Sequence, residues 1–316
     1  MVWWLYDIDI TPHGRGEAHK NGPMTDVQCV IAAGAQLGEG TFWDTAGQAL
    51  WWVDIFANTL HRFDPATGAQ QSYATPEAPG CVATRVGGGL VLTMTSGFFF
   101  FDPRQRVFEA IVDPESDLSA TRFNDGRTDR QGRFWSGSMV IDVAAQPNKI
   151  AALYCLHADL SCRRVLEHIG CANGLAWSPD GRTMYHADSH TSLIRAWDFD
   201  PSTAEIDNER IFVDLALIKG IADGATVDAE GCYWVTIPFQ GRLLRFDPAG
   251  VLMRTIELPC DIPTCCEFGG PDLDVLYVTS AVLNRTAREL ANQPLAGGLF
   301  AIDVGVRGLP AAPFAG

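Results

Sequence analysis

The sequence predicts an all-β fold, a six-bladed β-propeller with four strands in each blade. Two observations support this class. Similar segments recur at spacings of 42 to 50 residues, which is the length of one propeller blade. Short apolar strands alternate with turns in every segment, and no stretch longer than about two turns carries a helical stripe. Six such repeats lie between residues 37 and 304.

Each repeat follows one order of strands and turns. An apolar strand leads into a polar turn, as in the SPDG sequence that ends at Gly181. A second strand, rich in aromatic and β-branched residues, comes next, for example Leu50 to Val53. The third strand ends in an Asp-Pro pair, as at Asp64 and Asp247, because proline cannot continue a central strand.

The last repeat ends after its third strand, Leu299 to Ile302. The apolar segment Val27 to Ala33, ahead of the first repeat, can supply the missing fourth strand. We therefore expect an N-terminal strand to close the last blade, which removes two open sheet edges. Residues 24–316 would then form a single propeller domain, preceded by a disordered extension at 1–23 that is polar and glycine-rich from residue 11 onward.

Two repeats are longer than the others and predict insertions. The extra residues lie around 142–150 in the third blade and 201–220 in the fourth. They form either loops of the outer strands or rim elements that cover the mouth of the central channel.

Composition narrows the class of partner. The formal charge of −15 and the pI near 4.7 argue against nucleic acid or an anionic membrane surface. An apolar fraction of 47% and 10% aromatic residues fit a packed globular core. No apolar run approaches the roughly 20 residues of a membrane span.

The cysteines and the N-terminus indicate the compartment. Nine cysteines, an odd number without a C-x-x-C pair, are typical of reduced thiols. The first residues lack a basic region, and Asp7 interrupts their apolar stretch, so we do not expect a secretory signal. The sequence therefore predicts a cytoplasmic protein.

Six residues occupy equivalent places in the repeats, and we call them the register positions: Glu39, Cys81, Asn124, Asn173, Asp223 and Cys266. All but the last are followed by a glycine eight residues later. Because the inner strands of a propeller surround its axis, these residues should meet at one mouth of the channel. Four of them carry side-chain oxygens, which suit Ca²⁺, Mg²⁺ or Mn²⁺ better than a structural zinc.

Simpler interpretations stand beside this one. Asn-Gly and Asp-Gly pairs also form ordinary turns. Cys81 and Cys266 could contribute sulfur to a mixed metal site, but we expect them to fill the apolar side of the cavity. Asp125 and Asp129 are expected to be loop or cap residues. No G-x-S-x-G elbow is present, which argues against a serine hydrolase.

The motifs around these positions resemble those of a known family. They are LGEG at 37–40, RFNDG at 122–126, ANG at 172–174, ADG at 222–224 and PTCCEFGG at 263–270. Over residues 35–304 the chain resembles the gluconolactonase/regucalcin-like family, which includes senescence marker protein and consists of six-bladed propellers. Its members include sugar lactonases and animal proteins named for calcium binding.

The resemblance implies a set of site residues. One divalent cation, whether Ca²⁺, Zn²⁺, Mn²⁺, Mg²⁺ or Fe²⁺, would be held by Glu39, Asn173 and Asp223. Arg122 and Asn124 would hold a sugar-like substrate. An acidic residue after the Gly-Ser-Met segment contacts substrate in some members, and Asp142 is the candidate here.

We therefore expect metal-dependent hydrolysis of a small-molecule sugar lactone to the sugar acid. The cation would activate water, and Asp223 would act as general base. The forked donors of Arg122 suit neighbouring oxygens of the substrate. Two alternatives remain, namely a calcium-binding or scaffold propeller without catalysis and a metal-dependent esterase that acts on a non-sugar ester.

Overall fold

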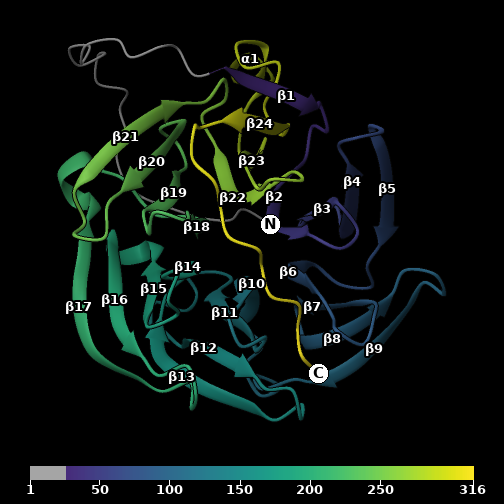
Figure 1. Cartoon of the computed structure of the whole chain (residues 1–316), viewed down its shortest axis with the longest axis vertical. Coiled ribbons are helices and arrows are strands. Elements are labelled where there is room, and N and C mark those ends of the chain that lie inside the picture. The colour runs from purple at the N-terminus through teal and green to yellow at the C-terminus, as the bar shows by residue number, and fades with distance from the viewer. Residues whose placement is uncertain (1–25) are drawn as a thin grey trace.

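The computed structural model describes residues 26–316, which form six four-stranded antiparallel sheets arranged in a ring (Figure 1). The prediction of a six-bladed propeller is confirmed. The expected extension at 1–23 lies outside the described residues. Each sheet is one blade, and its innermost strand faces the central channel.

Blades one to three use consecutive strands. Blade one contains β2 (Gly38–Asp44), β3 (Ala49–Asp54), β4 (Thr59–Asp64) and β5 (Ala69–Ala74). Blade two contains β6 (Pro79–Thr84), β7 (Leu90–Met94), β8 (Gly97–Asp102) and β9 (Val107–Val112). Blade three contains β10 (Thr121–Thr128), β11 (Phe134–Val140), β12 (Ala151–Leu156) and β13 (Cys162–Ile169).

The next two blades repeat this order. Blade four contains β14 (Ala172–Trp177), β15 (Thr183–Asp188), β16 (Leu193–Phe199) and β17 (Ile206–Asp214). Blade five contains β18 (Ala225–Val227), β19 (Tyr233–Ile237), β20 (Arg242–Phe246) and β21 (Leu252–Glu257).

Blade six joins the two ends of the chain. Its strands are β22 (Pro263–Gly269), β23 (Val275–Ser280), β24 (Leu299–Asp303) and, on the outside, β1 (Val27–Ile31). Val27 lies opposite Ile302 in the antiparallel pair of β1 and β24. The predicted closure by an N-terminal strand is therefore confirmed.

Between residues 26 and 316, helical structure is confined to three short pieces: the 3-10 turns η1 (Ser189–Thr191) and η2 (Leu215–Ile218) and the helix α1 (Ala287–Ala291). A capping box between Thr286 and Glu289 starts α1. Within residues 26–316, no helix is long and apolar enough to cross a membrane.

Aspartates at the turns after the inner strands support the aromatic core. In blade three, Asp129 accepts hydrogen bonds from the backbone N–H of Gln131 (2.9 Å) and from Nε1 of the buried Trp135 (2.9 Å). Asp228 and Trp234 repeat this contact in blade five at 2.9 Å. Asp129 is thus a turn cap, as the sequence predicts, and it also gives a buried indole its hydrogen-bond partner.

Strand pairing shows which residues of the inner strands are equivalent. Trp43 lies opposite Leu50 in blade one, Thr84 opposite Leu90 in blade two, and each of the other blades contains a matching pair. In each blade, the residue four positions before the inner-strand member of this pair occupies the same place. We call these six residues the mouth residues: Glu39, Gly80, Asn124, Asn173, Asp223 and Thr264.

The mouth residues correct two of the register positions. Gly80 and Thr264, not Cys81 and Cys266, are equivalent to Glu39. The glycine eight residues after a register position does not identify equivalent residues reliably, because the turns between the first and second strands differ in length. Blade two has a run of three glycines at 87–89, and the turn of blade six between Phe268 and Leu276 is longer than the others.

The two predicted insertions have different positions. Thr121 at the start of β10 pairs with Val140 at the end of β11, so the loop 141–150 lies at the mouth of the channel. In blade four, 200–205 is a turn at the opposite end of the strands, whereas 215–224 leads back to the mouth. Only part of the second insertion is therefore a rim element.

The C-terminal segment 304–316 crosses the other end of the channel, where it is drawn in yellow over the centre of the ring in Figure 1. Its backbone bonds to turns of three blades, through Gly308 N–H to Leu273 O (2.7 Å), Phe314 N–H to Thr84 O (2.7 Å) and Ala315 N–H to Gly132 O (2.9 Å).

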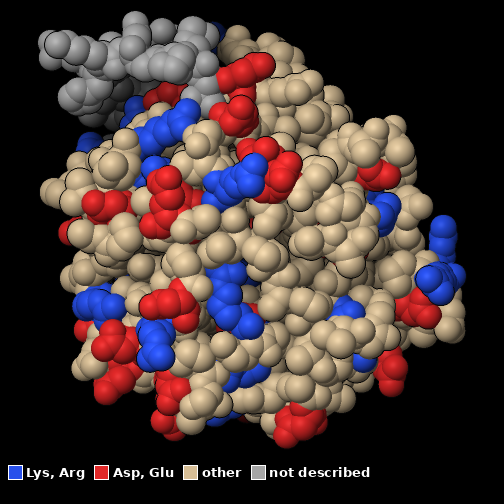
Figure 2. All heavy atoms as spheres, viewed as in Figure 1, with Lys and Arg blue, Asp and Glu red and all other residues tan. Residues whose placement is uncertain are grey.

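Basic and acidic side chains alternate over the face shown in Figure 2 without a large patch of one sign.

Phe314 anchors this segment, since its side chain is fully buried in the core of blades one to three and packs near Phe100. We expect Phe314→Ala to lower the free energy of unfolding by about 3–5 kcal/mol in chemical denaturation, because it leaves a cavity. Val107→Ala, at an exposed position of β9, is the control and should change stability little. An equal, small effect of both changes would contradict the anchoring role.

The assignment of Gly80 as a mouth residue leads to a second prediction. A Cβ added at Gly80 would lie 2.6 Å from the backbone oxygen of Asn124, in the neighbouring blade. Gly80→Ala should therefore cost about 1–3 kcal/mol of stability in urea denaturation through overpacking. Gly87→Ala is the matched control in the same blade, since its nearest neighbour is a flexible side-chain atom 4.0 Å away. Equal stability of the two variants would show that Gly80 has no close neighbour at the mouth.

Candidate active site

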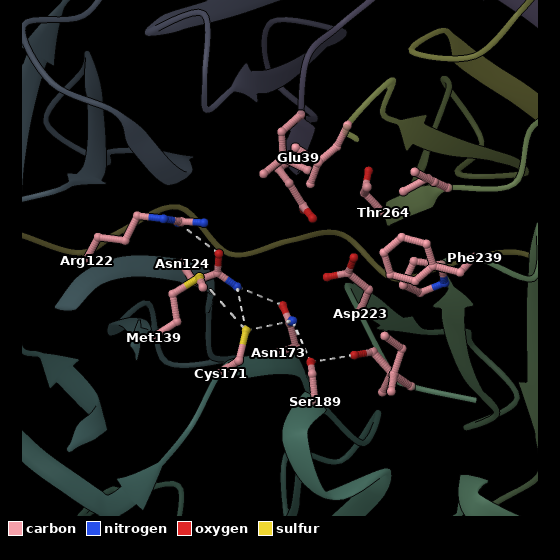
Figure 3. A pocket seen from close by; sticks show the side chains of 16 residues that line it. Glu39, Arg122, Asn124, Met139, Cys171, Asn173, Ser189, Asp223, Phe239 and Thr264 are labelled. Atoms are coloured by element: carbon pink, nitrogen blue, oxygen red, sulfur yellow. Dashed lines mark hydrogen bonds between the residues drawn. The ribbon is translucent and has the colours of Figure 1, made fainter. Parts of the chain in front are cut away.

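The four mouth residues with acid or amide side chains lie together in one pocket. Glu39 comes from β2, Asn124 from β10, Asn173 from β14, and Asp223 lies just before β18. Figure 3 shows their polar ends pointing toward one another at the mouth of the channel. The predicted convergence is therefore found for all four.

The surroundings of Glu39 and Asp223 disfavour the ionised form of both carboxyl groups. Burial and repulsion from neighbouring carboxylates raise the pKa of Glu39 well above its ordinary value. Asp223 retains partial access to the pocket, but it lies deep among protein atoms, and burial followed by repulsion from Asp125 raises its pKa to about 8. Among the ion pairs of residues 26–316, none involves either carboxylate.

Asp125 is a third carboxylate at this end of the channel. It is buried, and its Oδ2 accepts a hydrogen bond from the backbone N–H of Leu175 in the next blade (3.2 Å). Its charge raises the pKa of both Glu39 and Asp223. The expectation of an ordinary loop or cap residue is therefore wrong for Asp125.

A signal for Asp125 was present in the sequence. It directly follows the mouth residue Asn124, at a place where three other blades carry glycine: Gly40, Gly174 and Gly224. An acid in that set is exceptional, but the Asn-Asp-Gly sequence also matches a common turn, which hides it.

The donor set fits a divalent cation. Two carboxylates, Glu39 and Asp223, line one small space together with the side-chain amides of two asparagines, and carboxylate and amide oxygens are the ligands that hard cations prefer. A cation bound between Glu39 and Asp223 would supply the positive charge that their surroundings lack. It would then stabilise the ionised form of both groups.

Arg122 provides the positive charge on the opposite side of the pocket. Its Nη1 donates to the oxygen of Asn124 (3.0 Å) and to the backbone oxygen of Phe123 (2.8 Å). The buried Nε has no hydrogen-bond partner among the described residues. Burial lowers the pKa of this guanidinium, although nearby carboxylates oppose the shift.

Much of the remaining pocket wall is apolar, and the sequence did not identify it. Leu37, Met139, Ile221, Phe239, Ile262 and Leu283 come from loops and strands of five blades. Phe239 adopts a left-handed backbone conformation (φ 64°) in the β19–β20 turn, which is unusual for a bulky residue. An apolar wall opposite polar groups suits a ligand with one C–H face and one hydroxyl-bearing face.

Three other predicted residues lie outside this pocket. Cys81 and Cys266 are fully buried in the core, where the Cys81 sulfur contacts the hydroxyl of Thr93 (3.2 Å). They therefore fill space between strands and not the cavity wall. Asp142 is exposed in the loop 141–150 and accepts hydrogen bonds from the N–H groups of Ala144 and Ala145. All nine cysteines of the chain are free.

Comparison with known proteins agrees with this geometry. Residues 37–282 match the sequence profile described as the SMP-30/Gluconolactonase/LRE-like region. The chain belongs to this family. The match includes every mouth residue, and it confirms the resemblance seen in the motifs.

Members of the family are similar to the chain over nearly its whole length. Regucalcin of Danio rerio is 37% identical over 293 residues, which are 92% of this chain and 98% of the relative. The 6-deoxy-6-sulfogluconolactonase of Pseudomonas putida is 36% identical over 296 residues, 92% of this chain and 99% of the relative. The name of the bacterial relative supports the expectation of an ester hydrolase that opens lactones.

A crystal structure supports the same assignment. The calcium-binding protein regucalcin from Agrobacterium tumefaciens superposes with a TM-score of 0.87 at 27% identity. The superposition covers 92% of this chain and 97% of that protein.

Proposed function

We propose that the protein hydrolyses a sugar lactone to the sugar acid with a divalent cation held by Glu39, Asn173 and Asp223. The observation that carries this proposal is the meeting of two carboxylates and an amide with Arg122 and Asn124 in one pocket. A lactone is an uncharged cyclic ester, so its opening needs an activated water and a donor for the carbonyl oxygen. When bound, the cation supplies Lewis-acid polarisation and makes a nearby water more acidic.

Asp223 is the proposed general base. Its carboxylate has access to the pocket, so it can accept the proton of the attacking water and later pass it to the ring oxygen, which becomes a hydroxyl when its bond to the carbonyl carbon breaks. Burial and the nearby Asp125 raise the pKa of Asp223, so the affinity of its carboxylate for protons depends on neighbouring charge. Glu39 and Asn173 serve as ligands only.

Arg122 and Asn124 are the proposed substrate-binding residues. The Nε of Arg122 is buried and has no partner among residues 26–316, and such a donor would gain a hydrogen bond from a substrate hydroxyl or carbonyl in the pocket. The apolar wall around Phe239 would pack against the C–H face of the sugar ring. Asp142 stays a predicted substrate contact, and the exposed loop 141–150 at the mouth would have to bring it into the pocket.

A second function has its own support. Several relatives carry the name regucalcin, and the Agrobacterium protein is described as calcium-binding. The same three ligands could serve a protein that binds Ca²⁺ without turning over a lactone. A metal-dependent esterase with a non-sugar substrate would use the same ligands as well.

The free cysteines accord with the proposed reducing, cytoplasmic location.

The deciding experiment follows proton release from a panel of aldonolactones and a simple aryl ester, with and without EDTA. We expect lactone hydrolysis that EDTA abolishes and that Ca²⁺, Zn²⁺ or Mn²⁺ restores. Hydrolysis of the aryl ester alone would favour the esterase. Ca²⁺ binding without any turnover would favour the calcium-binding alternative.

Substitution of the two carboxylates tests the ligand set. Asp223→Asn should lower kcat/KM at least about 100-fold because it removes both a ligand and the base. Glu39→Gln should weaken cation binding in calorimetry while the chain still folds. Asp44→Asn, on the same strand as Glu39 but at its far end, is the control for removal of an acid. Full activity of cation-free Asp223→Asn would contradict the proposal.

Arg122→Ala separates substrate binding from cation binding. We expect KM to rise about tenfold through the loss of substrate hydrogen bonds, while calorimetry shows an unchanged cation affinity. Arg210→Ala, which breaks an exposed ion pair with Asp198, is the control. An equal loss of cation affinity would place Arg122 among the groups that maintain the metal site.

A further inference from the structure

We infer that Ser189 is a positioning residue for the cation site, because it fixes which end of the Asn173 amide faces the channel and joins that residue to the segment carrying Asp223. The inference rests on the proposed ligand role of Asn173. Ser189 begins the 3-10 turn η1, is 2% exposed and lines the same pocket.

The hydroxyl of Ser189 has a single proton, and its position determines the bonding. Ser189 Oγ lies 2.7 Å from the backbone oxygen of Ala222, which can only accept, so the proton is donated there. The side-chain atom of Asn173 that lies 2.8 Å from the same Oγ must then be a donor, which identifies it as Nδ2. The amide oxygen of Asn173 is therefore turned toward the channel, where a cation requires it.

The opposite end of the network leads to the same orientation. Arg122 can only donate, so the atom of Asn124 that it contacts at 3.0 Å is Oδ1. Asn124 Nδ2 then donates to the backbone oxygen of Ala172 (3.0 Å) and to Oδ1 of Asn173 (3.1 Å). The dashed lines in Figure 3 trace this chain from Arg122 to Ser189. An oxygen has two lone pairs, so Oδ1 of Asn173 can still bind a cation.

Ser189 also ties two ligands from different blades together. Asn173 belongs to blade four, whereas Ala222 directly precedes Asp223 at the start of blade five. One hydroxyl thus bridges the side chain of one proposed ligand and the backbone beside the other. Loss of this bridge would loosen both ligands without removing either.

The position of Ser189 is itself supported by its neighbours. Asp188 caps η1 by accepting from the N–H of His190 (3.1 Å), and it also accepts from the N–H of Cys171 (3.1 Å). Lys149, in the loop 141–150, pairs with the other oxygen of Asp188 at 2.5 Å. The rim loop and the cation site are therefore linked through the turn that carries Ser189.

The test compares Ser189→Ala with Thr191→Val in the full-length chain. Thr191 also carries a hydroxyl on η1, but it donates to the backbone oxygen of Asp188 (2.8 Å), away from Asn173. Titration calorimetry of the metal-free proteins with Ca²⁺ and with Mn²⁺ should show about tenfold weaker binding for Ser189→Ala. Thr191→Val should bind like the unchanged protein, and Ser189→Thr, which keeps the hydroxyl, should recover much of the affinity.

A second readout separates positioning from general stability. If Ser189 only positions ligands, a saturating cation concentration restores most of the kcat of Ser189→Ala, whereas a destabilised fold would stay impaired and show a lower Tm. Ser189→Ala affinity within twofold of the unchanged protein overturns the inference and leaves the proposed function standing. Failure of the unchanged protein to bind either cation overturns both.

Discussion

Hydrogen bonds between neighbouring inner strands hold the blades at one level around the channel. Asn124 bonds to the Ala172 carbonyl, Ser189 to the Ala222 carbonyl, and Gly224 to the Thr264 carbonyl at 2.7 Å. Thr264 joins blade six to blade one through a bond from its hydroxyl to the carbonyl of Gly38. Because these four bonds tie blades three, four, five, six and one in succession, the first residues of their inner strands lie at one level. The convergence of the site residues is a consequence of these contacts.

This convergence brings carboxylates of like charge close together, which costs free energy. A bound ligand of positive charge would lower that cost. Glu39 and Asp223 are held near each other and near Asp125, and burial together with repulsion from neighbouring carboxylates raises the pKa values of Glu39 and Asp223. The single cationic side chain that lines this pocket, Arg122, bonds to an amide and not to either carboxylate. In the described part of the chain, the charge at the mouth therefore accords with the proposed divalent cation, and Arg122 lies apart from the two carboxylates.

The two ends of the channel have different roles. At the mouth, loops of several blades and the 3-10 turns leave a pocket with polar and apolar walls. At the other end, the C-terminal segment and the buried Phe314 cover the turns that follow the inner strands. Thr264 shows how position and role can differ, because it occupies a mouth position yet uses its hydroxyl to bond to blade one. Membership of the SMP-30/gluconolactonase family accords with this arrangement.

The repeat spacing and strand chemistry determined the number of blades, the closing role of Val27–Ile31 and four of the six mouth residues, because these depend on local patterns. Only the tertiary structure decided the other two. Gly80 and Thr264 are equivalent to Glu39 through cross-strand pairing, which turns of unequal length conceal in the sequence. The burial of Asp125, the contacts of Ser189 and the apolar wall around Phe239 also depend on neighbouring blades, so no local pattern could reveal them.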